Sequence, residues 1–209
     1  MRPRVKICGM TRIEDAALAA ALGADAIGLI FTPRSPRCLT LAQAVAIRAA
    51  LPPMVSSVAL FMDAEAEQVR GIVAALQPDQ LQFHGGEDDD WCAQFGRPYL
   101  KALPMHGCSD VVGRMADFPR AAGFVLDGHA AGQAGGQGRS FDWSTLPRMQ
   151  RPWLLAGGLT PANVTQALRV ARPWGIDVSS GVESSPGIKD ALKLQHFFRE
   201  IHRETAAQN

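Results

Sequence analysis

The sequence has 209 residues, 47% of them hydrophobic and 20% charged, and its 21 basic and 20 acidic side chains leave a formal charge of +1. This balance excludes the broad basic surface that binds nucleic acid, because no run of lysine and arginine is interleaved with aromatic residues. The apolar stretches are far shorter than the roughly 18 to 20 residues of a membrane span. We therefore expect a globular protein with neither nucleic acid nor membrane as a partner.

Short apolar runs alternate with helical patterns along the chain. The runs predict eight strands, at 4–8, 26–31, 55–61, 80–82, 99–102, 123–127, 153–156 and 175–178. Between and after them, helical spacing is clearest at 13–22, 41–50, 64–76, 161–170 and 188–202, and faintest for the fifth and sixth helices. The repeating unit is thus a strand followed by a helix.

This repetition predicts the fold class. Nearly continuous apolar strands that alternate with helices are typical of a parallel sheet covered on both faces, with right-handed crossovers. Eight units in about 200 residues favour a closed (β/α)8 TIM barrel over an open doubly wound α/β sheet, which more often has five or six strands. No linker divides the chain, so residues 1–209 are expected to form one domain, with 128–140 as a mobile loop inside one repeat.

Two strand ends have the character of a phosphate site. Gly157 and Gly158 follow the seventh strand, and Ser179, Ser180 and Gly181 follow the eighth. Both loops offer backbone N–H groups with little obstruction, and the loops after these strands are the usual phosphate site of the barrel. A tight turn is the simpler explanation of the Gly157-Gly158 pair. The pair lies beside a second loop of the same kind, however, and this favours a phosphorylated small molecule as the ligand.

Cys8 and Asp127 are the candidate proton carriers, since each ends an apolar strand. The alternatives are a buried apolar thiol for Cys8 and a helix cap for Asp127. Lys6, two residues before Cys8, is expected to favour a thiolate, and desolvation is expected to raise the pKa of Asp127. A thiol and a carboxyl at one barrel mouth can share base and acid work on one substrate.

Arg37 lies in a loop restricted by Pro33 and Pro36, where its guanidinium can bind a carboxylate through paired hydrogen bonds. A solvated surface arginine is the alternative for Arg37, and a structural role is equally open for His84. The cysteines, at 8, 38, 92 and 108, and the other histidines, at 106, 129, 196 and 202, show no ligand spacing. Free thiols, structural histidines and no metal site are therefore expected.

Several motifs, in order, resemble those of the phosphoribosylanthranilate isomerase family. They are Val5-Lys6-Ile7-Cys8-Gly9-Met10-Thr11, Ser35-Pro36-Arg37, Leu81-Gln82-Phe83-His84-Gly85, Gly135-Gly136-Gln137-Gly138, Ala156-Gly157-Gly158-Leu159 and Asp177-Val178-Ser179-Ser180-Gly181-Val182-Glu183. The resemblance runs from about residue 4 to residue 198. The sequence departs from the family pattern at Phe83, where leucine is usual, and at Cys38, where an aromatic residue is frequent.

The resemblance implies a (β/α)8 isomerase of tryptophan biosynthesis that needs no metal and no organic cofactor. It implies that Cys8 is the general base, Asp127 the general acid and Arg37 the ligand of the anthranilate carboxylate. The phosphate would be bound by the loops at Gly157-Gly158 and Ser180-Gly181. The remaining expected substrate-binding residues lie at the same strand ends: Gln82, His84, Asp177 and Ser179.

Two other functions stay open at this point. One is a barrel enzyme for a related phosphosugar, such as an indoleglycerol phosphate synthase or a histidine-pathway isomerase; the synthase would need a catalytic lysine and glutamate, and Lys6 and Lys101 lie on strands. The other is a non-catalytic module that binds a phosphorylated ligand. The first residues lack the pattern of a signal peptide, so the cytoplasm is expected, and the chain is expected to be a monomer or a homodimer.

Overall fold

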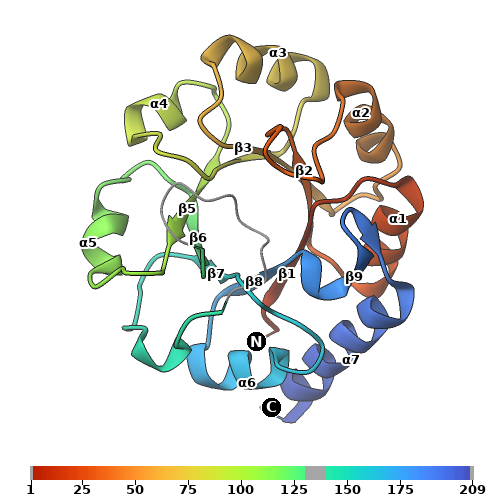
Figure 1. The fold of residues 1–209 in the computed structure, drawn as a ribbon, viewed down its shortest axis with the longest axis vertical. Helices are drawn as coiled ribbons and strands as arrows, with labels where there is room; N and C mark the ends of the chain where they lie inside the picture. Colours follow the sequence, from red (N-terminus) through yellow and green to blue (C-terminus); the bar gives the residue numbers. More distant parts are fainter. Residues whose placement is uncertain (1, 130–139, 208–209) are drawn as a thin grey trace.

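The computed structural model describes residues 2–129 and 140–207, which form a closed barrel of eight parallel strands in the order β1 to β8. Figure 1 shows this barrel end-on, with helices around it. The (β/α)8 prediction is thereby confirmed. The strands are β1 (Arg4–Cys8), β2 (Ala26–Ile30), β3 (Ser56–Phe61), β4 (Gln80–Phe83), β5 (Tyr99–Pro104), β6 (Gly123–Asp127), β7 (Trp153–Leu155) and β8 (Gly175–Val178).

Helices follow most of the strands. They are α1 (Ile13–Leu22), α2 (Leu41–Ala49), α3 (Ala66–Leu76), α4 (Asp89–Ala93), α5 (Val111–Ala116), α6 (Val164–Ala171) and α7 (Ala191–Ala207). In the described part of the connection from β6 to β7, the helical element is the short 3-10 helix η1 (Trp143–Thr145). Most of the segment 128–140, interpreted above as a mobile loop, lies outside the described residues, as does the motif at 135–138.

Strand alternation gives the barrel two separate sets of buried side chains. On β1, Val5 and Ile7 belong to the main apolar cluster with residues of the surrounding helices, whereas Cys8 groups with Ile30 and Leu60 in a different, small cluster. This separation is what a period of two produces when both faces of a sheet are covered. Short polar or reactive side chains such as Cys8 can therefore face the barrel interior while their neighbours stabilise the helix layer.

Beyond the last strand of the barrel, the chain forms a small hairpin. The 3-10 helix η2 (Ser180–Val182) leads into β9 (Glu183–Ser185), which pairs antiparallel with β10 (Ile188–Lys189) before α7 begins. The Thr11 hydroxyl donates a hydrogen bond to the Gly187 carbonyl in this hairpin. The hairpin is thereby tied to the loop after β1.

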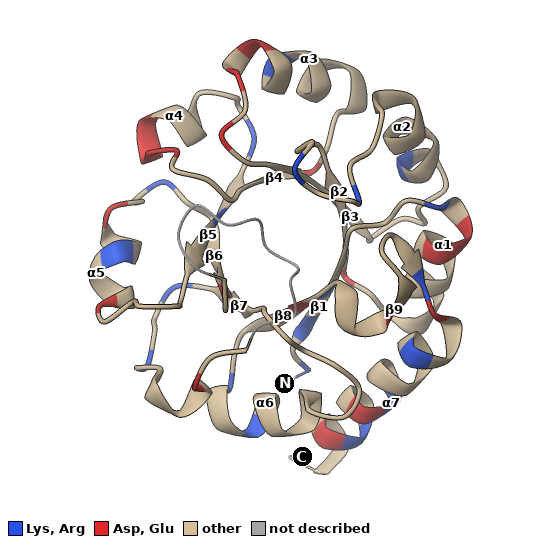
Figure 2. Cartoon of the chain, viewed as in Figure 1, with Lys and Arg blue, Asp and Glu red and all other residues tan. Residues whose placement is uncertain are grey.

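Charged side chains are interspersed around the outside of the barrel. Figure 2 shows both acidic and basic positions distributed over the ring of helices, in keeping with the small net charge. No helix among the described residues is both long enough and apolar enough to cross a membrane.

Candidate active site

A cavity with about 670 Å³ of empty space, part of it open to solvent, lies at the carboxyl ends of the strands. This end of a parallel barrel is where loops from different strands converge, and enzymes of this fold carry their active sites there. All the site residues expected from the sequence line this one cavity: Cys8, Arg37, Gln82, His84, Asp127, Gly157, Gly158, Asp177, Ser179, Ser180 and Gly181.

The cavity also has lining residues that the sequence reasoning missed. They are Ile30, Thr32, Ser35, Leu60, Met62, Ala156, Leu159 and Val178. Most are apolar residues at strand ends, and in the sequence they have the same pattern as residues of the core. Thr32 and Ser35 could have been found, since they belong to the loop that carries Arg37.

Cys8 ends β1 with its thiol inside the barrel, opposite Gly28 of β2. A Cβ at position 28 would lie 2.6 Å from the Cys8 sulfur, so only glycine leaves room for the thiol. Burial raises the pKa of Cys8, and the ammonium of Lys6 lowers it only in part. Lys6 thus favours the thiolate, as expected, but burial outweighs its effect, and the pKa of Cys8 is raised in the unliganded protein. Lys6 Nζ is also paired at 2.8 Å with Asp177 Oδ2.

Asp127 ends β6 between two histidines. Its Oδ2 lies 3.4 Å from His129 Nδ1 and 3.6 Å from His84 Nε2. Desolvation raises the pKa of Asp127, as expected, but the close contacts with His129 and His84 outweigh it, and the net pKa is lowered. The prediction of a raised pKa is thus wrong, because a residue interpreted as structural, His129, contacts the carboxylate.

The two histidines and Asp127 also form the one group of three potential metal ligands found in the described part of the chain. Their ligand atoms lie within 4.8 Å of one another, and all three residues are buried. Burial lowers the pKa of His84 to about 4, so its imidazole is neutral at neutral pH. Sequence spacing did not indicate this cluster, since residues 84 and 129 come from different strands.

Several buried polar atoms around the cavity have no hydrogen-bond partner among the described residues. They include Gln82 Oε1, His84 Nε2, Asp177 Oδ1 and Ser179 Oγ. Buried polar groups in native proteins are nearly always paired, so unpaired ones gathered on one cavity indicate that a polar ligand completes their hydrogen bonds.

The loop after β7 is shaped for close approach of an anion. Gly157 and Gly158 both have positive φ angles, 87° and 66°, which glycine adopts without strain. Asn163 fixes this loop, since its Nδ2 donates to the Gly158 carbonyl at 2.8 Å and its Oδ1 accepts from Thr160 N at 2.8 Å. Because Asn163 organises this turn, α6 begins at Val164 rather than at residue 161 as predicted.

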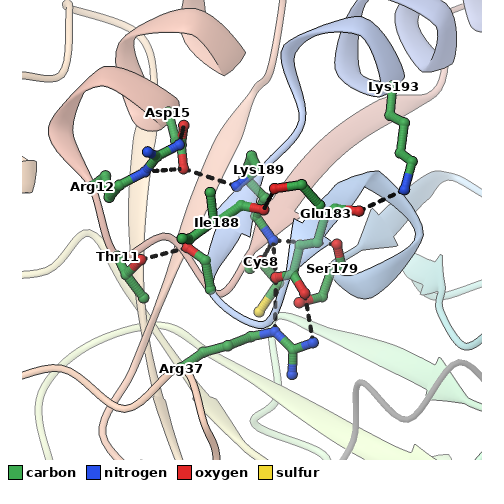
Figure 3. Close-up of polar contacts among 12 residues, drawn as sticks. Cys8, Thr11, Arg12, Asp15, Arg37, Ser179, Glu183, Ile188, Lys189 and Lys193 are labelled. Carbon is green, nitrogen blue, oxygen red and sulfur yellow. Dashed lines mark hydrogen bonds and ion pairs between the residues drawn. The ribbon is translucent and has the colours of Figure 1, made fainter.

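Arg37 is buried and held by Glu183 (Figure 3). Its Nε and Nη2 donate to the two carboxylate oxygens of Glu183 at 2.8 and 2.7 Å. Lys189 Nζ donates to the same carboxylate at 2.7 Å and to the backbone carbonyl of Cys8 at 2.7 Å. Neither Glu183 nor Lys189 was expected in the site; for Glu183, only its place at the end of the family-like motif that starts at Asp177 could have drawn attention to it.

The lysines considered for a synthase mechanism are both in ion pairs. Lys101 Nζ lies 2.8 Å from Glu87 Oε2 and donates to the Gly85 carbonyl, and neither Lys101 nor Glu87 lines the cavity. Lys6 is bound to Asp177, and its pKa is raised to about 12. Neither ammonium is placed for proton transfer in this cavity.

Comparison with known proteins gives one family. The model of "N-(5'phosphoribosyl)anthranilate (PRA) isomerase" matches residues 5–200. An N-(5'-phosphoribosyl)anthranilate isomerase of Xanthomonas campestris pv. campestris is 51% identical over 210 residues, which cover 97% of this chain and 94% of the relative. The crystal structure of phosphoribosyl anthranilate isomerase from Thermus thermophilus is 38% identical, with a TM-score of 0.86 over 96% of this chain and 98% of that chain.

A further solved structure similar to this chain carries a ligand. It is phosphoribosyl anthranilate isomerase in complex with reduced 1-(o-carboxyphenylamino)-1-deoxyribulose 5-phosphate. It is 32% identical to this chain, with a TM-score of 0.81 over 96% of this chain and 99% of that chain.

Proposed function

Because the chain belongs to the N-(5'-phosphoribosyl)anthranilate isomerase family, and is thus an isomerase of tryptophan biosynthesis, we propose how its residues divide the chemistry. The reaction is the Amadori rearrangement of N-(5'-phosphoribosyl)anthranilate to 1-(2-carboxyphenylamino)-1-deoxy-D-ribulose 5-phosphate. Cys8 is the general base and Asp127 the general acid. The observation that carries this assignment is that both line one cavity together with Arg37 and the glycine loop after β7.

The two ends of the substrate are bound by different parts of the cavity. The phosphate is held by the loops at Gly157-Gly158 and Ser179-Ser180-Gly181, and Arg37 holds the anthranilate carboxylate. Gln82, His84 and Asp177 bind the sugar between them, where their polar atoms need partners. Fixing both ends of a substrate places its reacting carbons between acid and base and removes much of the entropic cost of reaction.

The acid–base steps follow from this placement. Asp127, when protonated, donates its proton to the ribose ring oxygen, and the ring opens to a protonated Schiff base. The thiolate of Cys8 then removes the proton at C2, which gives an enolamine that tautomerises to the ketone. These steps use only protons, and we propose that the enzyme needs neither a metal ion nor an organic cofactor.

The setting of this activity is proposed as well. The protein acts in the cytoplasm on a small phosphorylated substrate, with no nucleic acid or membrane as partner. We propose that it works as a monomer or as a homodimer.

The activity itself is tested with the purified chain. We expect it to consume N-(5'-phosphoribosyl)anthranilate, measured as loss of the substrate's fluorescence, and to rescue a tryptophan auxotroph that lacks the isomerase. A related aminoimidazole carboxamide substrate serves as the control. Turnover of that control with none of the anthranilate substrate would contradict the proposal, as would saturable binding without proton exchange at C2.

The pKa directions predict an unusual pH profile for this mechanism. The pKa of Asp127 is lowered and that of Cys8 is raised, so the unliganded protein at neutral pH holds a carboxylate and a thiol. The reactive form, with a thiolate and a protonated acid, has the same total number of protons. The fraction of enzyme in this reactive form is constant at pH values between the pKa of Asp127 and the pKa of Cys8. Below that range kcat/KM falls as Asp127 takes up a proton, and above it kcat/KM falls as Cys8 loses one.

The substitution His129→Ala tests whether the pKa of Asp127 lies below that of Cys8. Removing the imidazole takes away a contact that lowers the pKa of Asp127, so that pKa rises. We expect the acidic limb of kcat/KM to move to higher pH and the plateau to rise with it. His196→Ala, on the exposed side of α7, is the control and should leave both unchanged. An acidic limb that stays in place in His129→Ala would contradict the assignment.

A further inference from the structure

Three charged groups are buried together beside the base, and their charges do not balance. Arg37 and Lys189 are both cations, and both bind the one carboxylate of Glu183. The side chains are almost fully buried, with exposed fractions of 8%, 0% and 5% for Arg37, Lys189 and Glu183. We call these three residues the Glu183 cluster. It has one positive charge more than it has negative charges.

Lys189 must be protonated in this cluster. Its Nζ donates to Glu183 Oε1 at 2.7 Å, to the Cys8 carbonyl at 2.7 Å and to the Ser179 carbonyl at 3.2 Å. All three partners can only accept hydrogen bonds, so the amine uses three N–H bonds, which only the ammonium has. Figure 3 shows Lys189 between Cys8, Ser179 and Glu183.

Neighbouring acidic groups do not cancel the surplus charge. Asp15 accepts a hydrogen bond from the backbone N–H of Lys189, but its carboxylate is already paired with Arg12 at 2.7 Å. Among the described residues, the carboxylates that contact Lys189 Nζ or Arg37 are those of Glu183 alone. An unbalanced charge in a buried position is costly unless an anion compensates it.

The anion has one place to bind. Lys189 uses all its N–H bonds, and Glu183 accepts two of those of Arg37. Among the described residues Arg37 Nη1 has no hydrogen-bond partner, and Arg37 lines the cavity. The free edge of the Arg37 guanidinium, at Nη1, therefore presents the extra positive charge of the Glu183 cluster to a ligand in the cavity.

We propose that Lys189 is a positioning residue: by sharing Glu183 with Arg37 it leaves Arg37 a net positive charge for the substrate carboxylate, and it holds the Cys8 carbonyl beside it. This inference rests on the proposed function, since the carboxylate that Arg37 binds is that of the anthranilate. Lys189 touches no reacting atom. It links the anion-binding arginine to the strand end that carries the base.

The test compares two inhibitors in Lys189→Met. One is reduced 1-(o-carboxyphenylamino)-1-deoxyribulose 5-phosphate, and the other is the same compound without its ring carboxyl. Methionine is apolar and of similar length, and it brings the charge of the cluster to zero. We expect the carboxylated inhibitor to bind about tenfold or more weakly, as for loss of a charged hydrogen bond, and the inhibitor without the carboxyl to bind as before.

Lys193→Met is the matched control. Lys193 also contacts Glu183, but through the backbone carbonyl, and its side chain is exposed. Its substitution should change neither affinity. Equal weakening of both inhibitors in Lys189→Met, or no weakening of either, would overturn the inference, because a purely structural lysine does not distinguish the two ligands.

Glu183→Gln keeps the inference testable if Lys189→Met fails to fold, as a thermal melt would show. This change removes the negative charge and leaves both cations, so the preference for the carboxylated inhibitor should be kept or increased. Loss of that preference would overturn the inference. Failure of the proposed function would look different, since the unsubstituted protein would then not turn over N-(5'-phosphoribosyl)anthranilate.

Discussion

Cys8→Ala is expected to lower kcat by about 100- to 10,000-fold, the contribution that a positioned acid or base makes to proton transfer. The thiol is the one group of Cys8 that the mechanism uses, and alanine removes it without adding volume next to Gly28. KM should change little, because Arg37 and the phosphate loops remain. Steady-state turnover of N-(5'-phosphoribosyl)anthranilate measures both constants.

The control for this substitution is Cys38→Ala. Cys38 is exposed and does not line the cavity, so its removal should leave kcat unchanged. Cys8→Ser adds a second comparison, because a serine hydroxyl has nearly the same shape but ionises far less readily than a thiol. If Cys8→Ala retained the rate of the unsubstituted enzyme, Cys8 would not be the base.

Asp127→Asn is expected to have an effect of similar size, again about 100- to 10,000-fold on kcat. The amide is close in shape to the carboxyl and can still contact His129, but it cannot give a proton to the ribose oxygen. The substituted enzyme should therefore bind the substrate and fail at ring opening. Rapid mixing with the fluorescent substrate separates binding from the chemical step.

The lowered pKa of Asp127 makes this test more informative. In the unliganded enzyme the acid is mostly ionised. The bound substrate brings a phosphate and a carboxylate into the cavity that Asp127 lines, and negative charges raise the pKa of a carboxyl group. Substrate binding thus helps to protonate the acid that it needs. Asp110→Asn, on the exposed cap of α5, is the control, and a normal rate in Asp127→Asn would end the assignment.

Much of the fold could be predicted from local sequence patterns. The limits of β1, β6 and β8 agree with those expected, because each is an apolar run with clear polar or glycine borders. The start of α7 could not be predicted in this way. The helical pattern extends back to residue 188, but Ile188 and Lys189 pair with β9 and leave the helix to begin at Ala191.

The site was predictable where its residues end a strand, since the barrel brings all strand ends to one rim. His129, Glu183 and Lys189 escaped notice for a physical reason. Each of them acts through a contact with a residue from another part of the chain. His129 contacts Asp127, Glu183 contacts Arg37, and Lys189 contacts the Cys8 carbonyl. The pKa of Asp127 depends on such a contact, with His129, and for this reason its direction was predicted with the wrong sign. For Cys8, burial has a larger effect on the pKa than the lysine two residues before it.

The hydrogen bond between Lys189 and the Cys8 carbonyl joins residues 181 positions apart in the chain. A contact between residues so far apart closes a large loop, which is entropically costly and slows folding. During synthesis, the N-terminal strand leaves the ribosome long before the lysine that supports it. The base therefore gains this support only after the segment around Lys189 has been made and has docked against the N-terminal strand.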